Sequence, residues 1–154
     1  MYKNILVATD GSDIAGEALS QAASLAKTLG AKVTVVTVSP PPPALAGPEM
    51  GWSIPSSVYD EIRKGNRERS KVILDTAVAK ARALGIEAAT RSVEDAEPHD
   101  GIIEAAKEIG ADLIVMGSHG YRGLNRLILG SEASKVLSLA PVPVLIVKPQ
   151  GAGR

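Results

Sequence analysis

Apolar and polar residues follow one another in blocks along this chain, and their periods predict five strands and four helices. Short apolar runs that end at polar or glycine-containing clusters are typical of buried strands, whereas apolar residues three or four positions apart are typical of helices with one buried face. The predicted strands are 5–8, 32–38, 87–93, 113–116 and 142–147. The predicted helices are 13–29, 57–84, 98–109 and 131–139.

A glycine stands between a helix and the following strand at three places, Gly30, Gly85 and Gly110. Glycine commonly ends a helix because it adopts the left-handed conformation without strain. Strands that alternate with helices in this way lie parallel and are joined by right-handed crossovers. We therefore predict an α/β domain with an open five-stranded parallel sheet, in the strand order 3-2-1-4-5, sandwiched by four helices.

Two segments depart from this regular alternation. Residues 39–56 are rich in Pro and Gly, and a segment of this kind is either a mobile connector or a functional lid. The predicted helix 57–84 is almost wholly polar from Arg63 to Lys71, so we expect its middle to project into water or to bend. Together the elements predict one domain over residues 1–150, followed by a flexible tail at 151–154.

Composition narrows the class of protein. Apolar residues make up 45% of the chain but aromatic residues only 3%, so the core must consist of Val, Ile, Leu and Ala, as in buried parallel sheets. The 17 basic residues equal the 17 acidic ones, which argues against a nucleic acid partner. The absence of cysteine excludes disulfides and thiolate chemistry. No apolar run reaches the length of a signal peptide or membrane span, so we expect a cytoplasmic protein with no membrane partner.

The spacing Gly-x2-Gly-x9-Gly-Ser follows the fourth predicted strand and consists of Gly117, Gly120, Gly130 and Ser131. Glycines let backbone amides approach an anion, and a helix N-terminus directs unpaired N–H groups toward it. Two such elements would hold a polyphosphate between them. The alternative is that the glycines only shape a turn and that Ser131 caps the last helix.

The predicted strand order points to the same place. The order reverses between the first and fourth strands, and open α/β sheets bind ligands at such a point, beyond the carboxyl ends of the strands. Ala8, Thr9 and Asp10 end one of these strands, and residues 116–120 end the other. Asp10 would accept hydrogen bonds from a ribose or adenine, cap the first helix, or do both.

The remaining candidate side chains restrict the chemistry further. Arg122 and Arg126, in the spacer of the glycine motif, either neutralise phosphate or are simply solvated. His99 and His119 have no carboxylate cluster at ligand spacing around them, which argues against a zinc site. Mg²⁺ would instead arrive bound to the phosphates of a nucleotide. The chain contains neither Gly-x4-Gly-Lys-Ser/Thr nor a Gly-x-Gly-x2-Gly after its first strand, so kinase-type and dehydrogenase-type activities lose their main support.

With these features the chain resembles the universal stress protein family, in the branch whose members bind ATP. The resemblance runs nearly end to end, through ILVATDGS at 5–12, LIVMGSHG at 113–120 and PVLIVK at 143–148. It is specific because Gly-x2-Gly-x9-Gly-Ser is the ATP-binding signature of that family. The fold it implies is the Rossmann-like one of the adenine nucleotide alpha hydrolases.

The resemblance also implies roles for individual residues. It assigns adenine and ribose to Asp10 and to the backbone around Ala8, Thr9 and Val38, with Met116 lining the pocket. It assigns the phosphates to Gly117, His119, Gly120, Gly130 and Ser131. It further implies a homodimer through the last strand, Val142 to Val147, which as an apolar edge strand would be an aggregation hazard unless a partner covered it.

Three residues depart from the family pattern. Glu132 and Ala133 follow Ser131, where ATP-binding relatives often have an apolar residue and then a hydroxyl, and Ala96 replaces a common glycine. Glu132 places a negative charge in the first turn of the last helix, which opposes a nearby phosphate. ADP or AMP is therefore an alternative to ATP as the ligand.

Three hypotheses of function follow. The first is an ATP-binding regulatory dimer of the stress response, with an unknown protein partner and at most slow hydrolysis, because no positioned base or arginine finger is evident. The second is a slow ATPase or nucleotidyl-transfer enzyme with Asp10 or His119 as the catalyst. The third is a nucleotide-free dimeric interaction protein, supported only by Glu132 and Ala133.

Overall fold

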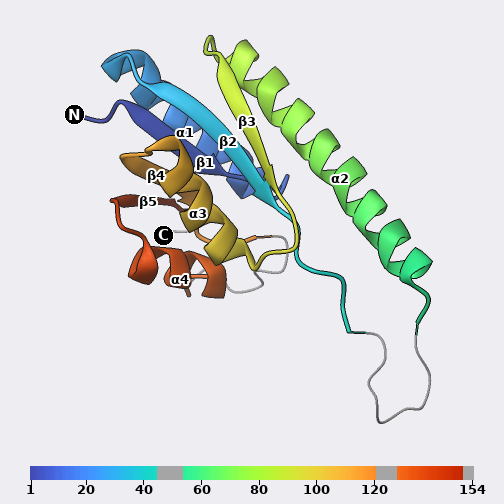
Figure 1. Cartoon of the computed structure of the whole chain (residues 1–154). Coiled ribbons are helices and arrows are strands. Elements are labelled where there is room, and N and C mark those ends of the chain that lie inside the picture. The colour runs from blue at the N-terminus through green and yellow to red at the C-terminus, as the bar shows by residue number, and fades with distance from the viewer. Residues whose placement is uncertain (45–53, 121–127, 151–154) are drawn as a thin grey trace.

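The computed structural model describes residues 1–44, 54–120 and 128–150, and in these ranges strands and helices alternate as predicted (Figure 1). The strands are β1 Asn4–Ala8, β2 Lys32–Val38, β3 Ala88–Val93, β4 Leu113–Gly117 and β5 Val144–Val147. The helices are α1 Asp13–Leu29, α2 Ser56–Ala83, α3 Pro98–Ile109 and α4 Ser131–Leu139. Residues 45–53 of the Pro/Gly-rich segment and the tail 151–154 lie outside the described residues.

The five strands form one parallel sheet in the order β3-β2-β1-β4-β5, which confirms the predicted order. Val7 in the central strand pairs with Val35 on one side and Val115 on the other. The last strand begins two residues later than predicted, because Pro143 has no N–H to donate to the ladder. Its carbonyl nevertheless accepts a hydrogen bond from the Ile114 amide at 3.0 Å.

Each face of the sheet is covered by two helices, and alternate residues of a strand point to opposite faces. Ile5 and Val7 pack with α1 and α2, whereas Leu6 and Ala8 pack with α3 and α4. The side of α1 that meets the sheet is mostly alanine, so this helix lies close to the strands. The central strands β1 and β4 are buried on both faces, which explains their uninterrupted apolar sequences.

The long helix α2 is continuous from Ser56 to Ala83 and runs straight, so the bend is absent, and most of its polar stretch is exposed as the other expectation has it (Figure 1). Its described buried residues all lie in the second half and are Ser70, Leu74, Ala77 and Ala81. The first half extends beyond the sheet (Figure 1).

Two ion pairs and a buried hydrogen bond tie α2 to the carboxyl end of the sheet. Arg63 contacts Asp95 at 3.2 Å and Arg67 contacts Glu94 at 2.8 Å, in the connection between β3 and α3. The hydroxyls of Ser39 and Ser70, both buried, lie 3.0 Å apart. Within the described ranges, no helix has the length and apolar character that a membrane span requires.

Candidate functional site

A cavity of about 480 Å³ opens at the carboxyl end of the sheet, where β1 and β4 meet. Its volume lies within the range of small-molecule sites. Every predicted site residue in the described part of the chain lines it: Ala8, Thr9, Asp10, Val38, Met116, Gly117, His119, Gly120, Gly130 and Ser131. Arg122 and Arg126 lie outside the described residues. The structure therefore brings the predicted set together, while nucleotide binding by these residues stays a prediction.

The turn after β1 is shaped by its own polar side chains. The Asp10 carboxylate accepts a hydrogen bond from the Ser12 amide at 2.9 Å, and the Thr9 hydroxyl accepts one from the Gly11 amide at 3.1 Å. Ser12, and not Asp10, caps α1, because the Ser12 hydroxyl accepts from the Ala15 amide. Asp10 is exposed and belongs to the lining of the cavity.

Two glycines of the motif stand where a side chain would collide with the opposite wall. A Cβ atom at Gly130 would lie 2.8 Å from the Ser118 carbonyl oxygen, and one at Gly120 would lie 2.6 Å from a carboxylate oxygen of Asp10. The Gly130 amide donates to that same Ser118 carbonyl at 2.8 Å. The glycines thus hold the ends of β1 and β4 and the start of α4 in close contact.

The N-terminus of α4 faces the cavity without a side-chain cap. Its N-cap residue is Gly130, and no side-chain cap bond occurs there among the described residues, so the alternative in which Ser131 caps the helix is wrong. The first N–H group paired within the helix is that of Ser134, which donates to the Gly130 carbonyl at 2.9 Å. The preceding amides of the first turn are therefore available to an anion.

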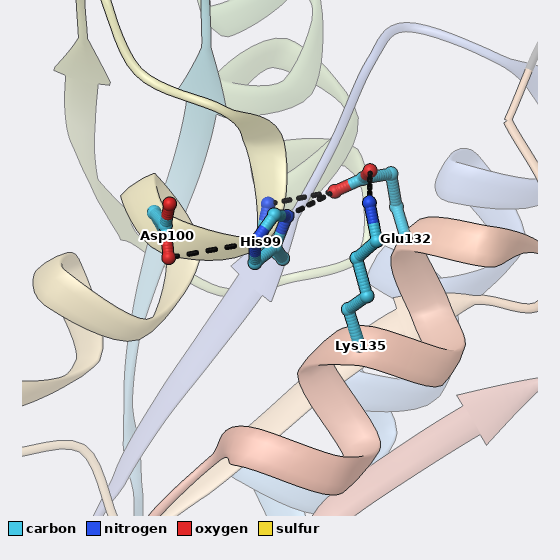
Figure 2. Close-up of polar contacts among 4 residues, drawn as sticks. All are labelled: His99, Asp100, Glu132 and Lys135. Atoms are coloured by element: carbon cyan, nitrogen blue, oxygen red, sulfur yellow. Dashed lines mark hydrogen bonds and ion pairs between the residues drawn. The ribbon is translucent and has the colours of Figure 1, made fainter.

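Glu132 joins the N-termini of α3 and α4. One oxygen of its carboxylate accepts hydrogen bonds from the backbone amide of His99 at 2.8 Å and from its ring Nδ1 at 2.9 Å, and the other contacts Lys135 at 3.3 Å (Figure 2). Partial burial alone raises the pKa of Glu132. The hydrogen bonds from His99 and Lys135 outweigh this effect, so the pKa of Glu132 lies below its ordinary value.

His119 has one ring nitrogen engaged and one buried without a partner. Its Nδ1 lies 2.9 Å from the Ser118 hydroxyl. Its Nε2 is buried and has no hydrogen-bond partner in the described part of the chain. A buried polar atom in this state is unusual in a folded protein, and it lies on a residue that lines the cavity.

The inner wall of the cavity is apolar and includes Val36, Val38, Ile102 and Met116. Val38 lies against α3 because Gly101 has no side chain there. A Cβ atom at Gly101 would lie 2.7 Å from both methyl carbons of Val38. An apolar wall opposite polar loops suits a ligand with a flat apolar part and a charged part.

Further lining residues were not among the predicted site residues. These are Ala15, Val36, Pro98, Ile102, Ser118, Glu132 and Ala133. In the sequence, the apolar lining residues cannot be distinguished from ordinary core residues. Glu132 is recognisable there because it departs from the family pattern. No group of three or more His, Asp or Glu side chains suitable for a metal ion occurs among the described residues.

Comparison with known proteins gives a consistent match over the chain. Residues 1–148 match the model of the universal stress protein family. The universal stress protein YxiE of Bacillus subtilis is 38% identical over 149 residues, which cover 96% of this chain and 100% of that protein.

Solved structures agree in fold. The universal stress protein UspA from Lactobacillus plantarum has a TM-score of 0.79 and 26% identity, covering 96% of this chain and 98% of its own. A universal stress protein from Archaeoglobus fulgidus in complex with dAMP has a TM-score of 0.69 and 30% identity, with coverages of 96% and 98%. A universal stress protein in complex with cAMP has a TM-score of 0.65 and 28% identity, with coverages of 95% and 96%. Sequence, fold and site geometry agree, and this chain belongs to the universal stress protein family.

Proposed function

We propose that this chain binds an adenine nucleotide, ATP, ADP or AMP, in the cavity at the carboxyl end of β1 and β4. The observation that carries the proposal is the position of Gly130. This glycine touches the Ser118 carbonyl at the uncapped start of α4, so a backbone cradle for an anion lies on the cavity wall. The cavity volume suits a ligand of this size.

The residues divide into two groups according to the part of the nucleotide they fit. The apolar wall formed by Val38 and Met116 suits the adenine ring, and the exposed carboxylate of Asp10 suits the ribose hydroxyls. The backbone of residues 117–120 and the first turn of α4 suit a phosphate. Because the described residues offer no metal cluster, Mg²⁺ would be held mainly by the phosphate oxygens.

Two solved structural neighbours support the class of ligand. One is described as a complex with dAMP and another as a complex with cAMP, and each shares the fold over at least 95% of this chain. Both ligands contain an adenine base. The shared feature that we transfer to this chain is therefore adenine recognition, and not a particular number of phosphates.

The biological role that we propose is a regulatory homodimer of the stress response, acting in the cytoplasm through a protein partner. Residues 1–150 would form its single domain, and β5 would supply the dimer interface. The position of the short apolar strand β5 at the edge of the sheet supports this interface, because an edge strand with no neighbour among the described residues invites pairing. Hydrolysis should be slow at most, since no base positioned for phosphoryl transfer is evident among the described residues.

The direct test is to denature freshly purified protein, analyse the supernatant for nucleotides by chromatography, and titrate nucleotide-free protein calorimetrically with AMP, ADP and magnesium-ATP. Co-purified adenine nucleotide or micromolar affinity for any of the three would support the proposal. A Gly130→Asp variant that folds should lose this affinity, because its side chain would enter the anion cradle. The proposal would be wrong if the wild-type protein bound none of the three.

A further inference from the structure

We propose that Glu132 makes the cavity select nucleotides by their number of phosphates, so that AMP binds more tightly than ATP. This inference rests on the proposed function, because it concerns the ligand of the same cavity. It follows from the way in which Glu132 occupies the N-terminus of α3 and from the charges on the cavity wall.

The N-terminus of α3 already holds a carboxylate, that of Glu132. Its N-cap residue, Glu97, makes no side-chain cap bond with any described residue. The cap comes instead from another helix, because the Glu132 carboxylate accepts the amide of His99 at 2.8 Å. The same oxygen also contacts His99 Nδ1, and Asp100 lies on the other side of that ring, 3.4 Å from Nε2 (Figure 2).

Two helix N-termini therefore lie on the cavity wall, and among the described residues a side-chain carboxylate caps only that of α3. The start of α3 already holds a carboxylate, and the start of α4 presents amides without a side-chain cap. A single phosphate needs only the start of α4. A second and third phosphate would add negative charge to a site whose wall already includes the carboxylate of Glu132, in the first turn of α4.

The other charges on the wall point in the same direction. Among the described lining residues there is no Lys or Arg, whereas Glu132 carries a carboxylate. Lys135 contacts Glu132 at 3.3 Å, but its side chain is only half buried and is not part of the lining. Because the hydrogen bonds from His99 keep the Glu132 pKa low, this carboxylate stays charged at neutral pH.

The test compares AMP and ATP binding to the wild-type protein, Glu132→Gln and Asp100→Asn by calorimetric titration without Mg²⁺. Glutamine keeps an oxygen acceptor for the His99 amide but removes the charge. Asp100→Asn is the matched control, because it removes an equal charge from the other side of His99 and lies outside the cavity lining. Thermal unfolding of each variant establishes that it is folded.

We expect the dissociation constant of the wild-type protein to be about tenfold lower for AMP than for ATP. A factor of this size corresponds to the repulsion between the Glu132 carboxylate and the two extra negative charges of ATP in a partly solvated site. Glu132→Gln should reduce this ratio at least about threefold, and Asp100→Asn should leave it unchanged. Equal ratios in the wild-type protein and Glu132→Gln would overturn the inference. Binding of neither nucleotide to the wild-type protein would instead overturn the proposed function.

A salt series on the wild-type protein gives a second measurement that requires no variant. Selection by charge should weaken as salt screens the carboxylate, so the ratio of ATP to AMP dissociation constants should fall toward one between low and physiological ionic strength. A ratio that is independent of salt would also contradict the inference, because a difference in shape or contacts would then be responsible.

Discussion

Gly130 holds the start of α4 against the end of β4 at the cavity wall. Its backbone conformation is one that alanine adopts without strain, so the effect of Gly130→Ala arises from the added methyl group alone. That group would meet the Ser118 carbonyl oxygen at 2.8 Å and push apart the two segments that form the anion cradle. We expect nucleotide affinity to fall at least about tenfold and the free energy of unfolding to fall by about 1–3 kcal/mol.

Gly65 provides the matched control for this prediction. It lies in the exposed first half of α2, and a Cβ atom there would meet nothing within 4 Å. Gly65→Ala should therefore leave nucleotide affinity unchanged and raise the free energy of unfolding by about 0.5–1 kcal/mol, the difference in helix propensity. Calorimetry and urea unfolding measure both effects. Equal nucleotide affinity in the two variants would contradict the role of Gly130.

Glu132 should contribute to stability in a way that depends on pH. Its pKa is lowered in the folded protein, so its contribution is fully present above the ordinary pKa of glutamate, about 4.3, and is lost as pH falls through the lower folded value. The difference in free energy of unfolding between the wild-type protein and Glu132→Gln should thus be constant near neutral pH and shrink in acid. Urea unfolding over a pH series measures it, and a difference independent of pH would contradict the assignment.

At the residue scale, site residues could be predicted from the sequence where they lie close together along the chain in a recognisable spacing. The glycine motif predicted the cradle because its members lie within one connection. The hydrogen bonds between Glu132 and His99 could not be predicted, because the two residues lie 33 positions apart and on different helices. The identity of the α4 cap was also missed, since serine and glycine are both common at that position.

At the scale of the elements, the buried hydroxyl pair of Ser39 and Ser70 joins the end of β2 to α2. Ser70→Ala would leave the buried Ser39 hydroxyl without this partner and should lower the free energy of unfolding by about 1–3 kcal/mol. Replacing both serines with alanine should cost less than the sum of the two single changes, because no polar group is then stranded. A double-mutant cycle by urea unfolding measures the coupling, and strict additivity would contradict it.

The elements themselves were predicted closely, apart from their ends. The polar stretch of α2 allowed either a bend or projection into water, because the sequence does not reveal what lies opposite a helix face. In the structure, Arg63 and Arg67 reach Asp95 and Glu94, so part of the polarity serves contacts with the β3–α3 connection. Each pair is exposed and stabilises the protein only slightly.

At the scale of the whole molecule, the order of the sheet was predictable because helices and strands alternate and parallel crossovers have one hand. The exposure of β3 follows from the same order, since it lies at one edge while β5 lies at the other. Dimerisation cannot be predicted from this alternation, because it depends on the shape and chemistry of the surface. Among the described residues, the edge position of β5 is the feature that supports the proposed dimer.

Leu145→Glu should weaken that dimer. Leu145 lies on β5 and is 36% exposed, so a charge there would face the apolar surface of a second copy. Sedimentation equilibrium should give a dimer for the wild-type protein and a shift toward monomer, at least about tenfold in dissociation constant, for the variant. Val72→Glu, on the exposed face of α2 near the opposite edge of the sheet, should leave the dissociation constant unchanged. A wild-type monomer at all concentrations would contradict the dimer.

The contact between Gly101 and Val38 has a consequence for how this protein could have changed during descent. The two residues share a volume that holds only one side chain of ordinary size, since a methyl group on Gly101 would lie 2.7 Å from the Val38 methyls. A lineage that gained a larger residue at position 101 would have to lose bulk at position 38, on the cavity wall. A change of residue on α3 and the shape of the cavity are therefore linked through the space that Gly101 and Val38 share.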